Sequence, residues 1–294
     1  MAGRSHRRER YREDSATLVS AMDSQMRAEA AARRRAARRF ADAVSREPAA
    51  AGAGRDAEVL SRLRGEAITG MGRVAYSSNA VFLVEFEGSD PGHPGEPLRA
   101  IYKPVRGERP LWDFPTGTLH MREAAAYVVS AFLDDGTVPP TTLRDGPHGP
   151  GSMQLFVHGA PADAPVDRES IEQQLRSVAA LDVLINNADR KRAHLLLADD
   201  GRLLGIDNAL SFLPYPRQRT VLIELGGQHL PDPVAGRVRS LGGDQQRRTA
   251  LRAELAMLLD GDEVAAFEQR LDALGETPSY PVLDPWDGRP FEWW

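Results

Sequence analysis

The sequence of 294 residues contains no cysteine. This excludes disulfide bonds, thiolate metal sites and a cysteine nucleophile, and it is consistent with a reducing cytosol. Long apolar runs are also missing, because no stretch reaches the ~18 residues expected of a membrane-spanning helix. No apolar segment follows the charged N-terminal residues, so we expect no secretory signal. We therefore predict a cytoplasmic, monomeric protein without stable membrane insertion. Its net charge of −5 argues against a polycation that binds nucleic acid.

The first part of the chain differs in composition from the rest. Residues 1–50 contain 12 arginines and 7 acidic residues, and residues 27–46 are mostly alanine and arginine, which favours helix. The apolar content is too low for an independent core, so we predict that residues 1–58 form an Ala/Arg-rich helical extension, solvated or docked, that ends in a linker at residues 48–56. An arm that binds nucleic acid or an acidic partner is the alternative, since clustered arginines neutralise phosphates.

The sequence from residue 59 onward predicts two regions of different character. The first, residues 59–159, is rich in alternating apolar patterns that indicate strands, with one helix among them. The strands are expected at residues 67–74, 79–86, 98–103, 138–143 and 151–159, and the helix at residues 118–133. The second region, residues 160–294, begins with an amphipathic helix at residues 168–186, followed by a β-hairpin around the turn at residues 199–201 and two further helices within residues 244–274. These patterns predict an α+β protein with a β-rich N-lobe and a mainly helical C-lobe.

Lys103 and Glu123 are candidates for binding the phosphates of a nucleotide. Lys103 closes the predicted strand at residues 98–103, from which its ammonium group would reach the cleft between the lobes. Glu123 lies on the next predicted helix, where it could pair with Lys103. An ordinary surface lysine at the end of a strand is the alternative.

Asp189 and Asp207 are candidate catalytic and metal-binding carboxylates. Asp189 lies in the loop after the long predicted helix, and Asp207 follows the second strand of the predicted hairpin, where it could bind Mg²⁺ through oxygen. Arg190 is a candidate catalytic residue together with Asp189, and it could hold the aspartate or its loop in place. Each residue alone could be explained as a helix stop or a turn aspartate. The pair, separated by a hairpin, matches the needs of phosphoryl transfer, which are carboxylates for the metal and for the attacking hydroxyl.

The segment LDVLINNADRKRAHLLLADDGRLLGIDNALSF (residues 181–212) resembles the catalytic and metal-binding loops of the phosphatidylinositol 3-/4-kinases, especially the type II phosphatidylinositol 4-kinases. The blocks SSNAVFLVEF, IYKP and VPPTTLRDGP precede it in the same order. The chain also resembles an uncharacterised actinobacterial branch of phosphatidylinositol 3-/4-kinase-like proteins, over roughly residues 59–294. The resemblance implies a two-lobed protein-kinase-like fold and dependence on ATP with Mg²⁺ or Mn²⁺.

The resemblance also implies roles for individual residues. Lys103 would bind the nucleotide phosphates with Glu123 as its partner, Asp189 would be the catalytic aspartate, and Asp207 the main metal ligand. Further nucleotide contacts would come from the turn that takes the place of the phosphate-binding loop (Ser77, Ser78 and Asn79) and from the interlobe hinge (Gln154, Phe156 and Val157, continuing to His158).

The sequence departs from the family pattern in two places. His194 occupies the position of the second metal ligand, which is Asn in the lipid kinases; imidazole prefers softer ions than Mg²⁺, so either Mn²⁺ is favoured or His194 only packs at the start of the hairpin. The turn at residues 75–79 also lacks glycine.

The four histidines at positions 120, 148, 158 and 229 show no spacing that suggests a metal site, and we expect them to be solvated or hydrogen-bonded.

The functional hypothesis is a kinase that phosphorylates a soluble metabolite or a protein hydroxyl. A nucleotide-binding pseudokinase that acts as a scaffold or regulator is one alternative, and nucleotidyl transfer on the same fold is another. Residues 212–227 carry Arg217 and Arg219, which would suit an acidic or phosphorylated substrate, but no long basic or apolar membrane-facing segment. A phosphoinositide acceptor is therefore not expected.

We expect Trp112 to pin its surface loop and the Trp-rich tail to dock onto the helical lobe or a partner.

Overall fold

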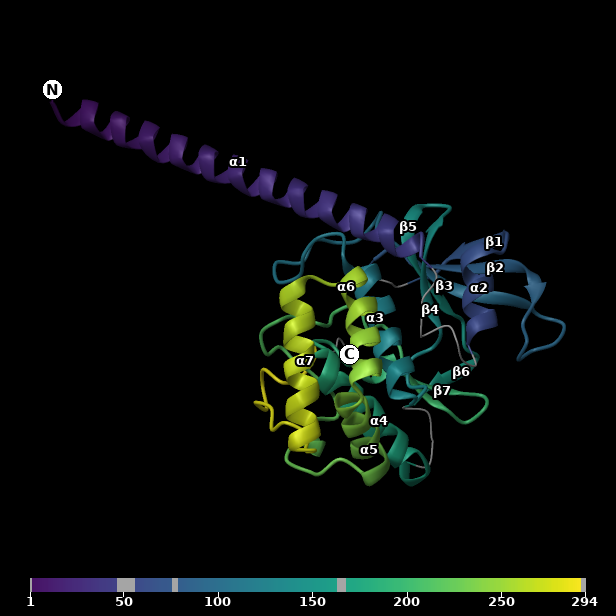
Figure 1. Ribbon diagram of the computed structural model, residues 1–294. Coiled ribbons are helices and arrows are strands. Elements are labelled where there is room, and N and C mark those ends of the chain that lie inside the picture. The colour runs from purple at the N-terminus through teal and green to yellow at the C-terminus, as the bar shows by residue number, and fades with distance from the viewer. Residues whose placement is uncertain (1, 47–55, 76–78, 163–167, 292–294) are drawn as a thin grey trace.

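The computed structural model describes residues 2–46, 56–75, 79–162 and 168–291, and its side chains from residue 21 on except those of residues 168–170 (Figure 1). A five-stranded antiparallel sheet in the order β1-β2-β3-β5-β4 forms the first lobe. The strands are β1 (Ile68–Arg73), β2 (Phe82–Ser89), β3 (Pro97–Pro104), β4 (Thr141–Gly146) and β5 (Gly149–Leu155). Helix α2 (Ala57–Gly65) packs against this sheet, and helix α3 (Leu119–Leu133) connects β3 to β4. The sheet and these two helices make up this lobe, and α3 also packs against the helices that follow.

Strand β3 shows why the sequence places Lys103 as it does. Its side chains alternate between the two faces of the sheet, as the period of two requires. Leu98, Ala100 and Tyr102 are fully buried in the small core of this lobe, with Val84 and Phe86 of β2 opposite. Lys103 is therefore directed to the other face of the sheet.

The second lobe is mainly helical and begins with a small three-stranded sheet in the order β6-β7-β8. Its strands are β6 (Gly159–Pro161), β7 (Leu195–Ala198) and β8 (Leu203–Gly205). Its helices are α4 (Arg168–Ile185), α5 (Asp232–Gly243), α6 (Gln245–Leu258) and α7 (Gly261–Glu276), with short 3-10 turns at Arg192–His194 and Ile223–Leu225. One large apolar core joins α3 to these helices, so the interlobe helix belongs to both lobes.

Helix α1 (Ala2–Val44) extends from the body as a long rod, and only its end contacts the rest of the protein (Figure 1). At this end Ala36 and Phe40 are buried in the main core, and the Phe40 ring lies 5.4 Å from the His120 ring. Arg39 forms an ion pair with Asp260 at the start of α7. The extension is therefore a helix over residues 2–44 that is docked at its C-terminal end.

The prediction of an α+β, two-lobed fold is confirmed, with a β-sheet lobe followed by a mainly helical lobe and preceded by a helix. Helix α5 and strand β6 were not predicted. The residue before helix α5 is Pro231, its second residue is Pro233, and it ends in two glycines. Proline and glycine are usual at helix ends, but they weaken the apolar periodicity from which a helix is predicted. The division at residues 58 and 59 stays a prediction, and it falls inside α2. Among the described residues, no helix is both long and apolar enough to cross a membrane.

The described part of the chain bears on two expectations about tryptophans, and it contradicts the first. Trp112 is 85% exposed, so it does not pin its loop into a core. The tail segment contacts the helical lobe through its backbone, because Thr220 N–H donates to the Gly288 carbonyl at 2.9 Å, yet Trp286 is 88% exposed. Trp293 and Trp294 lie outside the described residues.

The docking of α1 predicts a matched pair of substitutions on one helix. Phe40→Ala removes a buried ring and should lower the free energy of unfolding by about 3 kcal/mol. Met26→Ala, at a position 64% exposed on the same helix, should change it by less than about 0.5 kcal/mol. Urea unfolding measures both, and equal effects would contradict the docking of α1.

Candidate active site

Three charged side chains meet where the two lobes join. The Nζ of Lys103, at the end of β3, lies 2.9 Å from Oε2 of Glu123 and 2.9 Å from Oδ1 of Asp207. Glu123 is fully buried on α3, and Asp207 follows β8 with half of its side chain exposed. The structure therefore brings together the lysine, its expected helix partner and the expected metal ligand from three segments far apart in the sequence.

The charges in this group shift one another's pKa values. Burial alone would lower the pKa of Lys103, but the negative charges of Asp207 and Glu123 outweigh it and raise that pKa above its usual range. The positive charge of Lys103 in turn lowers the pKa of Asp207 well below its usual range, against the opposing effect of burial. At neutral pH, Lys103 is thus a cation and Asp207 an anion.

The backbone around Asp207 is held in an unusual conformation. Asp207 has a φ of 56°, in the left-handed region that non-glycine residues seldom adopt. The next residue, Asn208, donates its N–H to Oε1 of Glu123 at 2.9 Å and its side-chain amide to the Gly205 carbonyl at 2.9 Å. These bonds account for the sharp turn, and they direct the Asp207 carboxylate to Lys103.

His194 faces the other oxygen of Asp207. Its Nε2 lies 3.3 Å from Asp207 Oδ2, and its Nδ1 lies 2.9 Å from the backbone carbonyl of Asp189. The Lys191 N–H also approaches Nδ1, at 3.4 Å, but the shorter contact favours the tautomer with its proton on Nδ1. Burial lowers the pKa of His194 to about 4, so its ring is neutral at pH 7 and the Nε2 lone pair points at Asp207. A neutral imidazole held by a carbonyl beside a carboxylate is a donor set that fits a divalent metal ion.

Asp189 lies beside this pair, in the loop after α4. Its Oδ2 accepts a bond from the Lys191 ammonium at 2.8 Å, and its N–H donates to Oδ1 of Asn187 at 2.9 Å. Burial raises its pKa, and the nearby charge of Asp207 adds to that effect, while Lys191 opposes it. A carboxylate with a raised pKa is better suited to accept a proton than an ordinary aspartate is.

Arg190 was predicted with Asp189 as a catalytic residue, but its side chain is fully buried away from the cleft. It forms an ion pair with Asp182 at 2.8 Å, donates to the Ile206 carbonyl at 2.8 Å and donates to Oδ1 of Asn208 at 2.5 Å. These contacts tie α4, the Asp189 loop and the end of β8 together. Arg190 therefore positions the loop, and its two partners, Asp182 and Asn208, were not predicted from the sequence.

A cleft of about 270 Å³ adjoins the group, close to the lower end of the ~300–1,000 Å³ typical of ligand pockets. Lys103, Asp207 and His194 line it together with two of the predicted nucleotide contacts, Asn79 and Gln154. Phe156 and Val157 are described but do not line it, and Ser77 and Ser78 lie outside the described residues. The nucleotide-binding roles expected of these four residues stay predictions.

Glu108 and His120 also line the cleft, and neither was assigned a role from the sequence. Glu108 accepts backbone N–H groups of Gly117 and Leu119 at the start of α3, and burial raises its pKa. Both ring nitrogens of His120 are buried without a hydrogen-bond partner among the described residues, and burial lowers its pKa to about 3. The expectation that His120 is solvated or hydrogen-bonded was therefore wrong.

Comparison with known proteins gives one clear relative. The Mycobacterium tuberculosis (strain ATCC 25618 / H37Rv) protein Rv2133c is 36% identical over 268 residues, which cover 77% of this chain and 91% of the relative. No family model matches the chain.

Solved kinase structures resemble the chain more distantly. The Golgi casein kinase with Mn/ADP bound has a TM-score of 0.48 and 14% identity, covering 75% of this chain and 74% of its own. The Helicobacter pylori proinflammatory kinase CtkA has a TM-score of 0.47 and 9% identity, covering 74% of this chain and 94% of its own. Similarity at this level assigns no residue roles to this chain.

The buried position of Glu123 predicts a coupling that unfolding experiments can measure. Lys103→Met should destabilise the protein by about 3–5 kcal/mol, because it leaves a buried carboxylate without its cation. Adding Glu123→Gln removes the charge but keeps an oxygen for the Asn208 N–H, so the double variant should be more stable than Lys103→Met alone. A double-mutant cycle in urea measures this coupling, and additive effects would contradict the ion pair.

Proposed function

This chain belongs to the same family as the mycobacterial protein Rv2133c, and we propose that it is an ATP- and divalent-metal-dependent phosphotransferase. One arrangement carries this proposal. The Lys103 ammonium lies 2.9 Å from Asp207, and the other oxygen of that carboxylate lies 3.3 Å from a neutral His194 at the wall of a cleft. Phosphoryl transfer needs a cation on the phosphates and a carboxylate on the metal, and this site offers both within one triphosphate's reach.

Each residue has a distinct proposed role. Lys103 binds the nucleotide phosphates, and Glu123 fixes its position. Asp207 and His194 hold the divalent ion, which when bound would neutralise charge on the phosphates. Asp189, with its raised pKa, orients the attacking hydroxyl and accepts its proton. Arg190 holds the loop that carries Asp189.

We further propose that the acceptor is a hydroxyl of a soluble metabolite or of a protein. Arg217 stacks on the exposed Trp112 ring, 5.3 Å from its centroid, and lies 3.5 Å from a carboxylate oxygen of Asp113. This surface therefore offers an aromatic ring and a partly neutralised cation instead of a strongly basic face for a lipid headgroup. A phosphatidylinositol 3-/4-kinase-like affiliation stays part of the proposal and is supported by the order of the motifs around Lys103, Asp189 and Asp207.

Nucleotide binding is tested first by thermal unfolding with ATP in Mg²⁺ and, separately, in Mn²⁺. ATP at 100 times its Kd should stabilise the protein by about 2.7 kcal/mol, a shift of about 5–10 °C. Asp207→Asn should abolish the metal-dependent part of the shift. Asp200→Asn is the matched control, since Asp200 is an exposed carboxylate in the turn of the same hairpin, paired with Arg202 at 2.7 Å. If Asp200→Asn loses the shift as well, or if wild type shows none, the proposed site is wrong.

The same proteins then separate the possible reactions. Transfer of label from the γ-phosphate of ATP, lost in Asp189→Asn, supports the kinase. A product that carries the mass of AMP indicates nucleotidyl transfer. Binding without any transfer indicates the pseudokinase alternative, in which the site regulates a partner.

His194 predicts a metal preference. Imidazole suits Mn²⁺ better than Mg²⁺, whereas an amide oxygen is a hard ligand that suits Mg²⁺. His194→Asn should therefore raise the ratio of Mg²⁺- to Mn²⁺-supported transfer by about tenfold, which corresponds to roughly 1.4 kcal/mol in relative affinity. Initial rates across a titration of each metal measure the ratio. An unchanged ratio would mean that His194 does not bind the ion.

A further inference from the structure

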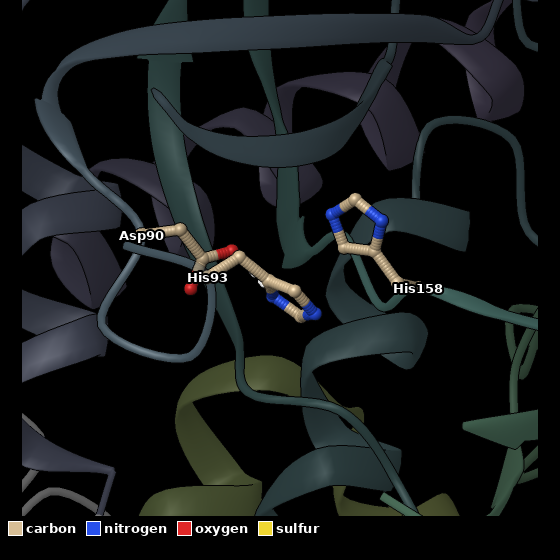
Figure 2. A group of neighbouring side chains, drawn as sticks. All are labelled: Asp90, His93 and His158. Carbon is tan, nitrogen blue, oxygen red and sulfur yellow. Dashed lines mark ion pairs between the residues drawn. The ribbon is translucent and has the colours of Figure 1, made fainter. Parts of the chain in front are cut away.

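A second group of metal-ligating side chains lies outside the proposed active site. Asp90 and His93 belong to the loop between β2 and β3, and His158 follows β5 in the connection between the two lobes. One ligand atom from each residue can be chosen so that all three lie within 4.8 Å of one another. Figure 2 shows the Asp90 carboxylate and the His93 ring of one loop beside the His158 ring, which comes from a segment far away in the sequence.

The polar atoms of this cluster are only partly used within the protein. Oδ1 of Asp90 accepts the Gly92 N–H at 2.8 Å, which leaves Oδ2 facing Nδ1 of His93 at 3.6 Å, too far for a hydrogen bond. Nδ1 of His93 is buried and has no hydrogen-bond partner among the described residues. Buried polar nitrogens rarely lack a hydrogen-bond partner, so Nδ1 of His93 is a candidate to bind a ligand.

We propose that Asp90, His93 and His158 bind a zinc-class divalent ion at the junction of the lobes. Two imidazoles and one carboxylate are donors that zinc binds in proteins, with water or a fourth side chain completing the tetrahedron. Glu96 closes the same loop, and its Oε2 lies 3.6 Å from Nε2 of His158. It is therefore placed to supply that fourth oxygen or to accept the N–H of the bound ring.

The cluster requires only a small contraction to bind such an ion. Ligand atoms about 2.0–2.1 Å from a tetrahedral zinc lie roughly 3.4 Å apart, and the ligand atoms here all lie within 4.8 Å of one another. The His93 and His158 rings already lie with centroids 4.1 Å apart and planes tilted by 38°. Both side chains are partly exposed, so their rings are the groups we expect to rotate when an ion binds.

The position of the cluster indicates what the ion does. The His158 carbonyl accepts the Asp199 N–H at 3.0 Å, in the turn between β7 and β8, so the connection is already tied to the second lobe. The β2–β3 loop belongs to the first lobe, and its ends are joined by a bond of 2.9 Å from the Asp90 N–H to the Glu96 carbonyl. A bound ion would therefore link a loop of one lobe to the connection that leads into the other, and limit the motion between them.

Zinc chloride alone tests this inference on the full chain, without nucleotide. The metal-stripped protein is dialysed against zinc and its bound zinc is counted. His93→Ala and His158→Ala should each bind one zinc fewer than wild type. His229→Ala is the matched control, an exposed histidine of the second lobe whose Nδ1 lies 3.2 Å from the Ser279 hydroxyl, and it should bind as much as wild type. At 100 times its Kd, zinc should raise the unfolding temperature of wild type by about 5–10 °C.

The comparison is repeated in the Asp207→Asn background, so that zinc bound by the proposed active site does not enter the count. The loss of one zinc in both variants there supports the site. Equal zinc in wild type and His93→Ala, or a loss in only one of the two variants, would overturn it. Unfolding of each variant without zinc shows that it is folded. Because no nucleotide is present, failure here leaves the proposed phosphotransferase untouched, and failure of ATP binding leaves this site untouched.

Discussion

The buried carboxylate of Glu123 is the constraint that organises the candidate active site. A carboxylate fully removed from water is costly unless a cation and hydrogen-bond donors surround it. Here the cation is Lys103 from β3, and the donor is the Asn208 N–H just after β8. One buried charge thus fixes the distance between the sheet of the first lobe, the interlobe helix and the hairpin of the second lobe.

A second buried ion pair lies in the helical lobe and is linked to the first. Arg190 and Asp182 are both fully buried, and the guanidinium also reaches Oδ1 of Asn208. Asn208 therefore connects the two ion pairs, because its backbone N–H donates to Glu123 and its side-chain oxygen accepts a bond from Arg190. The conformation of Asp207, with its positive φ, is held between these two anchors. This explains how a half-exposed carboxylate can be placed accurately at the rim of a cleft.

Much of this arrangement follows from local sequence patterns, and the remainder does not. The alternation in β3 predicted both the strand and the direction of Lys103, and the helical spacing after residue 168 placed Asp189 at the end of a helix. The buried partners Asp182 and Asn208 were not predicted, because ion pairing within a core depends on which segments meet in three dimensions. For the same reason Arg190 was assigned to catalysis, and His158 was expected to be solvated or hydrogen-bonded. Its neighbours, Asp90 and His93, come from a loop whose approach to the hinge no local pattern indicates.

Lys103 is bound to Asp207 in this structure, and this contact bears on how a nucleotide would bind under the proposed function. One oxygen of Asp207 accepts a bond from the Lys103 ammonium, and the other faces Nε2 of the neutral His194 ring at 3.3 Å. Under the proposed function, a metal ion that binds with ATP would share these oxygens, and Lys103 would move from Asp207 toward the phosphates while it keeps Glu123. One cation beside Asp207 would then be replaced by another. Because the positive charge of Lys103 lowers the pKa of Asp207, the carboxylate is already ionised before a metal ion binds. Lys103 would therefore have two roles in the proposed function: it keeps the carboxylate ionised, and it would bind the phosphates.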